Sequence, residues 1–225
     1  MSREKVILSW SGGKDSAFTL YKLLKNPDYE VVSLLTTITR EYDRVSMHGV
    51  RCNLIEQQAN SAGLPLVKVY IPSNCTNEIY SSIMEDEMKK LKLSGVNTVA
   101  FGDIYLRDVR DYRVKNLSRV DMECLFPLWE MDPLVVIRDF IDTGFKSITT
   151  CIDIRVLNVK FLGRVIDRSF LAELPPEIDP AGEKGEFHSF VFDGPTFKNK
   201  IPFKTGESVL RDNFNFIDLL PENSC

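Results

Sequence analysis

With 225 residues, the chain has the length of one large domain or of one domain with a smaller appendage. Hydrophobic residues make up 44% and charged residues 27%, a composition typical of a globular protein and unlike that of a low-complexity chain. The formal net charge of −4 argues against a broad nucleic-acid-binding surface, so we expect any contact with RNA to be local.

The cysteines and the apolar segments predict a cytoplasmic protein that has no membrane segment. The five cysteines are too widely spaced for a C-x-x-C redox or zinc pair, and their odd number argues against a disulfide framework. The N-terminus lacks an apolar core long enough for a secretory signal, and no apolar run approaches the ~20 residues of a membrane span. Free thiols in a reducing cytosol agree best with this pattern.

The first 130 residues alternate between strand-like and helix-like segments. The predicted strands cover residues 5–10, 30–37, 66–71, 98–101 and 124–128, and the predicted helices cover residues 16–24, 52–62, 77–94 and 106–120. Such alternation is typical of βαβ units, and the apolar first, second and fourth strands indicate a sheet that is covered on both faces. We therefore predict an α/β fold with a parallel five-stranded sheet flanked by helices.

The pattern changes after residue 130. Helices are predicted at 133–142 and 163–173, and strands or hairpin arms are predicted at 148–152, 190–192, 196–198 and 208–219. A loop rich in Pro, Gly and Glu covers residues 174–190. We predict a nucleotide-binding domain over 1–130 and a smaller α+β domain, which binds the substrate, over 131–225.

The segment Ser11-Gly12-Gly13-Lys14-Asp15-Ser16 lies between the first predicted strand, which ends near Ser9, and the first predicted helix. A helix N-terminus presents unpaired N–H groups and a positive dipole end, and glycines let a phosphate approach the backbone closely. The Walker A pattern is not met, because Asp follows Gly-Lys where Ser or Thr is required. The segment predicts a phosphate site, and the alternative is a Gly-rich turn at an ordinary helix start.

The six residues SGGKDS resemble the PP-loop of the adenine nucleotide α-hydrolase-like ATP pyrophosphatases. This resemblance implies a Rossmann-like fold and cleavage of ATP between its α and β phosphates. It makes ATP the expected nucleotide, with Mg²⁺ as its cation. The predicted ATP-binding residues are Ser9, Ser11, Gly12, Gly13, Lys14, Asp15, Ser16, Thr36, Thr37, Gly102 and Asp103.

Three further stretches, VAFGDI, MECLFPLW and DPAGEKGEFHSFVFDGP, resemble the diphthine–ammonia ligase family over nearly the whole chain. The resemblance implies an ATP-dependent amidation. A substrate carboxylate is adenylated, pyrophosphate leaves, and ammonia displaces AMP. The implied acceptor is diphthine on elongation factor 2. A glutaminase domain has no room in this length, so we expect free ammonia.

One stretch departs from the family pattern. This chain has GEKGEFHS where the family reads closer to GEGGEYET, and the EFH form resembles a bacterial-type branch. The acceptor therefore stays open. The alternatives are a PP-loop ligase with a different small-molecule substrate, a nucleotide-binding sensor without ligase activity, and an RNA-modifying enzyme. A homodimer is compatible with the sequence.

Two positions follow predicted strands at the edge where α/β sheets bind ligands. Asp103, preceded by Gly102, is the candidate Mg²⁺ ligand, and its alternative role is to cap the next helix. Thr36 and Thr37 end the second strand and are candidates to contact the nucleoside, although β-branched residues are also common in ordinary strands.

The candidate catalytic and substrate-binding residues lie in three other segments. His48 and His188 are the only histidines, and either can position a carboxylate or relay a proton from ammonium. Glu183 and Glu186 form a carboxylate pair in the loop, and Arg107, Arg110 and Arg113 share a helix face whose alternative role is ordinary solvation. The predicted catalytic residues are Lys14, Glu186 and His188. The predicted substrate-binding residues are His48, Arg107, Arg110, Glu123, Glu183, Glu186 and His188.

Overall fold

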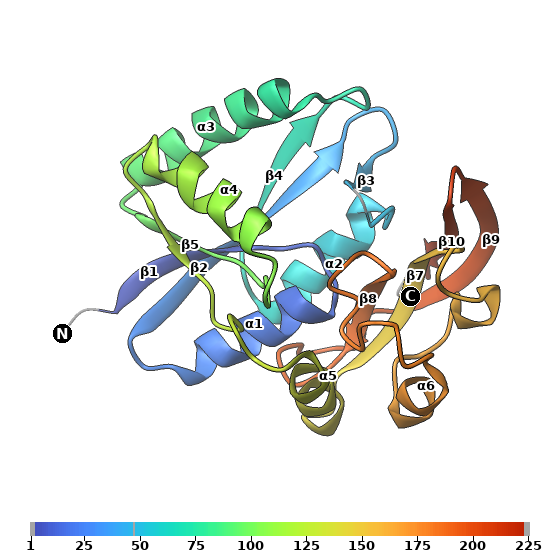
Figure 1. Cartoon of the computed structure of the whole chain (residues 1–225). Coiled ribbons are helices and arrows are strands. Elements are labelled where there is room, and N and C mark those ends of the chain that lie inside the picture. Colours follow the sequence, from blue (N-terminus) through green and yellow to red (C-terminus); the bar gives the residue numbers. More distant parts are fainter. Residues whose placement is uncertain (1–2, 47, 223–225) are drawn as a thin grey trace.

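The computed structural model describes residues 3–46 and 48–222 (Figure 1). Its first part contains β1 (Glu4–Ser9), α1 (Lys14–Lys25), β2 (Tyr29–Thr39), β3 (Arg44–Val45), α2 (Cys52–Ala62), β4 (Leu66–Ile71), α3 (Asn77–Leu93), β5 (Thr98–Ala100), α4 (Arg107–Ser118) and β6 (Glu123–Leu125). Five parallel strands are paired in the order β4-β2-β1-β5-β6, and the short β3 pairs antiparallel with the end of β2. The predicted α/β fold is confirmed.

Helices cover both faces of this sheet. Val6 and Leu8 of β1 belong to the core formed with α1 and α2, whereas Ile7 belongs to the core formed with α3 and α4. Figure 1 shows α1 and α2 on one side of the sheet and α3 and α4 on the other. This alternation follows from the two-residue period of a strand, so strands that are buried on both faces have to be apolar throughout.

The chain order places a topological switch point between β1 and β5. After β1 the chain adds β2 and then β4 on one side, and it returns to add β5 and β6 on the other. In open α/β sheets, ligands bind beyond the carboxyl ends of the strands at such a point. The SGGKDS loop follows β1 and the segment Phe101–Ile104 follows β5, so both lie at this position.

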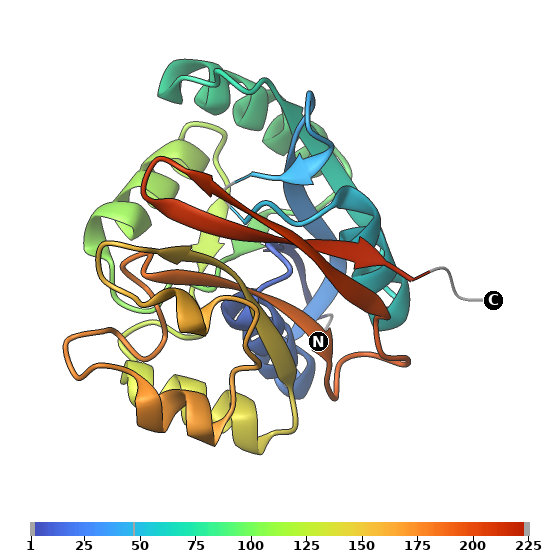
Figure 2. The ribbon, with the colours of Figure 1, turned by 90° about the vertical axis from the view of Figure 1, so that its right-hand side faces the viewer.

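The second part contains α5 (Pro133–Asp142), β7 (Lys146–Asp153), η1 (Val159–Phe161), α6 (Arg168–Glu173), β8 (Phe187–Asp193), β9 (Phe203–Arg211) and β10 (Phe214–Pro221). Its four strands form an antiparallel sheet in the order β8-β7-β10-β9. Figure 2 shows the β9–β10 hairpin, in red, running across the face of the molecule past the light-blue β3 segment.

Two predictions for this part were wrong. The helix predicted over 163–173 begins only at Arg168, because the preceding backbone is paired with β7 and the Asp167 side chain caps the helix at Phe170 N. The segment 196–198 forms a turn instead of a strand.

Both parts of the molecule contribute to one continuous core, in which Phe18 of α1 packs edge-on against Phe140 and Phe145. The proposed boundary near residue 130 stays a prediction.

Within residues 3–46 and 48–222, no helix combines the length and the apolar character needed to cross a membrane.

Candidate active site

The SGGKDS loop turns sharply so that its backbone faces the switch point. Gly12 has φ +78°, and a Cβ at this position would lie 2.4 Å from Ile55 Cδ1, so any other residue would be strained and would have to displace its neighbours. The Ser11 hydroxyl accepts a hydrogen bond from Gly13 N at 3.2 Å, and α1 begins at the next residue, Lys14. The loop thus directs a helix N-terminus toward the cavity, the arrangement that suits an anion.

Strand β8 forms the opposite wall of the loop, although it lies 175 residues away in sequence. Ser189 Oγ accepts a hydrogen bond from Lys14 N at 3.1 Å, and Val191 N donates to Gly12 O at 2.9 Å. Figure 1 shows β8, in orange, beside α1. The C-terminal part therefore helps to hold the SGGKDS loop and to build the candidate phosphate site.

A polar cavity of about 230 Å³ lies between these walls. The SGGKDS loop and the GEKGEFHS segment both contribute to it. Its lining consists of Ser9, Ser11, Gly13, Lys14, Asp15, Ser16, His48, Phe101, Gly102, Asp103, Arg113, Gly182, Glu183, Gly185, Phe187, His188 and Ser189.

An apolar cavity of about 220 Å³ adjoins the polar one. It lies between the sheet, α3 and α4, and Leu35, Tyr80, Met84 and Met88 are among its walls. The two cavities share the lining residues Ser9, Ser11, His48, Phe101 and Arg113. An apolar compartment that opens into a charged one has the layout needed by a nucleotide, whose base is flat and apolar and whose phosphates are anionic.

The side chains of Lys14 and Asp15 form an ion pair in the loop. Lys14 Nζ lies 2.7 Å from Asp15 Oδ2, and Asp15 Oδ1 is buried without a hydrogen-bond partner. Burial raises the pKa of the Asp15 carboxyl, and the neighbouring Lys14 partly offsets the effect. Because Mg²⁺ with a nucleotide uses one or two carboxylates plus phosphate oxygens, Asp15 Oδ1 is a suitable ligand. Among the described residues, no group of three or more potential ligands forms a separate metal site.

Asp103, the predicted metal ligand, is engaged by an arginine. Arg113 Nε and Nη2 donate to its two carboxylate oxygens at 2.5 and 3.0 Å. The Arg113 guanidinium also stacks over the Phe101 ring, with its central carbon 4.3 Å from the ring centroid. The ion pair occupies part of the Asp103 carboxylate, and its predicted role as a metal ligand stays a prediction.

The two glutamates of the GEKGEFHS segment have different environments. Glu186 turns into its own loop and accepts hydrogen bonds from Asp179 N and Lys184 N, and it does not line the cavity. Glu183 does line the cavity and accepts from Ile104 N at 2.8 Å. Burial raises the pKa of Glu183 to about 7, with the neighbouring Asp15 adding to the effect. The geometry favours Glu183 over the predicted Glu186 for contact with ligands.

The two histidines, distant in sequence, meet at the cavity. Their ring centroids lie 4.5 Å apart. Burial lowers the pKa of His188 to about 4, and burial together with the adjacent His188 and Lys14 lowers the pKa of His48 well below its usual value. The lowered pKa values keep both imidazoles neutral near pH 7 and make them weak bases.

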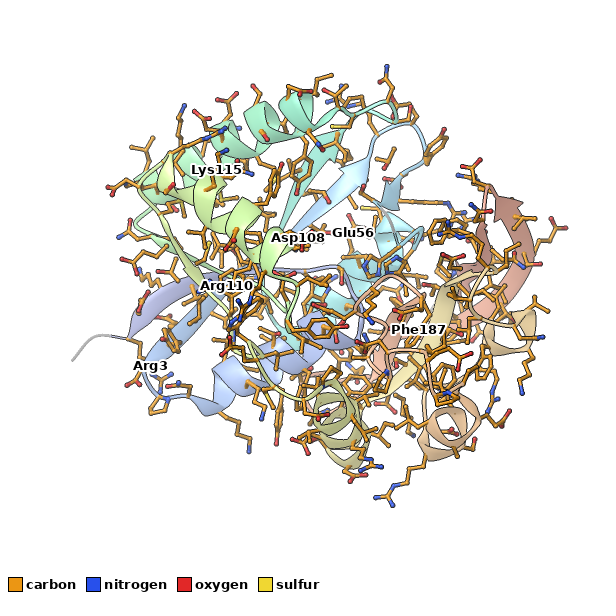
Figure 3. All side chains as sticks on the ribbon, in the orientation of Figure 1. Arg3, Glu56, Asp108, Arg110, Lys115 and Phe187 are labelled. Atoms are coloured by element: carbon orange, nitrogen blue, oxygen red, sulfur yellow. The ribbon has the colours of Figure 1, made fainter. Side chains whose placement is uncertain are left out.

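Besides Gly12 and Glu186, four predicted site residues do not line either cavity. Thr36 and Thr37 point to opposite sheet faces, so Thr37 lines the apolar cavity and Thr36 is buried outside both. Glu123 begins β6 opposite Thr98, at the amino end of the sheet, far from the switch point. Arg107 is exposed, and the Arg110 guanidinium stacks on Phe126 and Trp129. Figure 3 labels Arg110 on α4 and Phe187 across from it on the C-terminal part.

Sequence reasoning missed Gln58, which is completely buried and joins three segments. Its side chain accepts from Trp10 Nε1 and donates to Gly12 O and Val191 O. It therefore fixes the loop against β8. A glutamine within an amphipathic helix carries no motif, and only the unusual combination of a polar residue on the apolar face of α2 could have indicated it.

Comparisons with known proteins agree over most of the chain. The family model described as "Diphthamide synthase N-terminal domain" matches residues 4–123, and "Diphthamide synthase C-terminal domain" matches residues 132–220. A diphthine–ammonia ligase of Rattus norvegicus is 26% identical over 225 residues, with 89% of this chain and 83% of that protein covered. The Schizosaccharomyces pombe diphthine–ammonia ligase is 28% identical, with 98% of this chain and 39% of the longer yeast protein covered.

Among solved structures, the U34-tRNA thiolase NcsA from Methanococcus maripaludis is 16% identical, with a TM-score of 0.38 over 64% of this chain and 59% of that one. The two family matches together span both parts of the molecule and include both cavity motifs. The chain belongs to the diphthamide synthase family.

Proposed function

We propose that the protein is an ATP-dependent, amide-forming ligase of the diphthine–ammonia ligase type. One observation carries the proposal. The SGGKDS loop and the GEKGEFHS segment line a single polar cavity, which opens into an apolar cavity at the switch point of the sheet. Family membership supports the same chemistry.

In the proposed complex, adenosine occupies the apolar cavity and the triphosphate occupies the polar one. Tyr80, Met84 and Phe101 offer apolar surface to the base. Gly13, Lys14 and the hydroxyls of the loop surround the phosphates. Mg²⁺ bound beside Asp15 supplies further neutralisation of the phosphate charge when present.

The reaction proceeds in two balanced steps. A carboxylate oxygen of the acceptor attacks the α-phosphorus, the bond to the β-phosphate oxygen breaks, and pyrophosphate leaves with the electron pair. Ammonia then attacks the acyl carbon of the mixed anhydride, AMP leaves, and one proton is released with the amide. Lys14 and the α1 N-terminus stabilise the charge that develops on the leaving group, which is the largest catalytic contribution expected in such a site.

The released proton needs an acceptor near the anhydride. His48 and His188 are neutral and line the polar cavity, and Glu183, with a pKa of about 7, lines it as well. We propose Glu183 for this role, because its pKa lies near the working pH, whereas the lowered pKa values of His48 and His188 make these side chains weak bases. The acceptor of the reaction is diphthine on elongation factor 2 if this chain acts as its named relatives do, and another carboxylate otherwise.

The test combines purified protein, Mg²⁺-ATP, ammonium and elongation factor 2 that carries diphthine. The expected products are the amide, AMP and pyrophosphate in equal amounts. Lys14→Met should lower the rate about 100-fold or more, whereas Lys25→Met, at the far end of α1, should leave the rate unchanged. Release of ADP and phosphate would contradict the proposal, and ATP binding without turnover of any carboxylate would favour the sensor alternative.

A further inference from the structure

Arg113 lies at the junction of the two cavities. It belongs to the middle of α4 and is the one residue of this helix that lines both of them in the part of the chain that the structure describes. A ligand that extends from the apolar cavity into the polar one therefore passes beside Arg113 and the other residues that line both cavities. For a nucleotide, the group at the junction is the phosphate next to the ribose.

The Arg113 guanidinium is held in place, and some of its N–H donors remain free in the described part of the chain. Its stacking on Phe101 fixes the plane of the group, and its bidentate pair with Asp103 uses Nε and Nη2. The side chain of Asp103 is 12% exposed and that of Arg113 is 29% exposed, so the carboxylate is more deeply enclosed than its partner. A planar guanidinium has five N–H donors, and two parallel ones match a phosphate as well as they match a carboxylate.

We propose that Arg113 binds the α-phosphate of ATP by exchanging part of its pairing with Asp103 for phosphate oxygens. In the absence of nucleotide, the Asp103 carboxylate takes the place of the phosphate and keeps the Arg113 guanidinium oriented. The inference rests on the ATP-binding part of the proposed function and is independent of the acceptor.

The exchange makes a prediction that a purely structural ion pair would not make. Because Asp103 competes with the phosphate for the same donors, neutralising Asp103 should strengthen nucleotide binding when no divalent cation is present. Removing Arg113 should weaken it, and only for ligands that carry the α-phosphate.

Isothermal titration calorimetry of the full chain in EDTA tests this with three probes, namely adenosine, AMP and ATP. Arg113→Met should weaken AMP and ATP binding about tenfold or more and leave adenosine binding within about twofold. Arg113→Lys should give an intermediate loss, because a point charge lacks the paired donors. Asp103→Asn should tighten ATP binding severalfold. Lys115→Met is the matched control on the exposed surface of α4 (Figure 3) and should bind all three probes as the parent does.

Arg113→Met leaves the enclosed Asp103 carboxylate without its partner and can impair folding. The double variant Asp103→Asn/Arg113→Met is the control, because it removes the unpaired carboxylate as well. It should fold and still bind AMP more weakly than Asp103→Asn does. Equal losses for adenosine and AMP, a loss for ATP alone, weaker ATP binding by Asp103→Asn, or no ATP binding by the parent protein would each overturn the inference. A parent protein that binds ATP and fails to form an amide would overturn the ligase proposal alone.

Discussion

At the scale of single residues, a side chain's role depends on the groups that it faces. Glu183 and Glu186 belong to one motif, yet they differ in environment. Glu186 accepts hydrogen bonds from two backbone N–H groups, whereas Glu183 lines the cavity. Sequence spacing could not separate them, because the loop lacks the regular period of a helix or strand. The sharp turn of the loop was predictable from its glycines, whereas the phosphate-binding role of Gly12, Gly13 and Lys14 stays a prediction.

Glu183 should make ATP binding depend on pH. With its pKa at about 7, the side chain is neutral in mildly acidic solution and becomes an anion beside the phosphates as the pH rises. ATP affinity of the parent protein, measured in EDTA and divided by that of Glu183→Gln, should therefore fall between pH 6 and 8. The ratio cancels the titration of ATP itself. A ratio that stays constant over this range would remove Glu183 from the phosphate cavity.

The same shift has a consequence for stability. A carboxyl whose pKa is raised in the folded protein favours folding only while it is protonated. The parent protein should therefore lose stability relative to Glu183→Gln as the pH rises from about 4.5 to about 7, and the difference should level off above that. Urea unfolding of both proteins at several pH values measures the difference.

Glu186→Ala should behave as a structural variant. It leaves two backbone donors without their acceptor, at about 1–3 kcal/mol for each group that stays buried. We expect a lower Tm, and we expect added ATP to recover part of the loss because the residues of the proposed phosphate site are retained. Full stability combined with absent turnover would instead restore Glu186 to a catalytic role.

At the scale of elements, the predictions were correct where residues close in sequence determine the ends of a helix or strand. The bounds of α2, β4 and α5 agree with the predicted ranges. Gly63 ends α2 with φ +72°, and Asp132 caps α5 ahead of Pro133. The prediction for 163–173 failed because pairing with β7 is a tertiary contact, which overrides local helix preference.

Gln58 connects α2, the loop and β8, so its replacement should affect all three. In Gln58→Leu, Trp10 Nε1 and Val191 O lose their hydrogen-bond partner, whereas Gly12 O still accepts from Val191 N. We expect a loss of roughly 2–4 kcal/mol in the free energy of unfolding, from two buried groups left unpaired. Gln57→Leu, on the same helix and partly exposed, is the matched control and should change stability little.

At the scale of the whole molecule, a second contact joins the two sheets. Asp218 of β10 accepts hydrogen bonds from Arg44 at 2.8 Å and from Arg51 at 2.6 and 3.1 Å. Phe216 of the same strand packs against Gly49. His48 lies within this clamped segment, so β10 helps to hold a cavity residue. The sequence could not predict the contact, because nothing local relates residues more than 160 positions apart.

The clamp should weaken in acid. The two arginines hold the pKa of Asp218 at about 2, below its usual 3.8, so the stabilisation is present above about pH 4 and disappears as the pH falls toward 2. Asp218→Asn should lower the free energy of unfolding by about 1 kcal/mol at pH 7, since the pair is partly exposed. The difference from the parent protein should shrink below pH 4. A difference that is the same at pH 3 and pH 7 would show that the ion pair is not its cause.

The hydrogen bond from Lys14 N to Ser189 Oγ also has a consequence for synthesis of the protein. At about 5–20 residues per second, the ribosome adds Ser189 roughly 10–35 s after Lys14. During that interval the first sheet can begin to fold, but the nucleotide site lacks one wall. We therefore expect a nascent chain to acquire its affinity for ATP late and abruptly, when β8 reaches the loop.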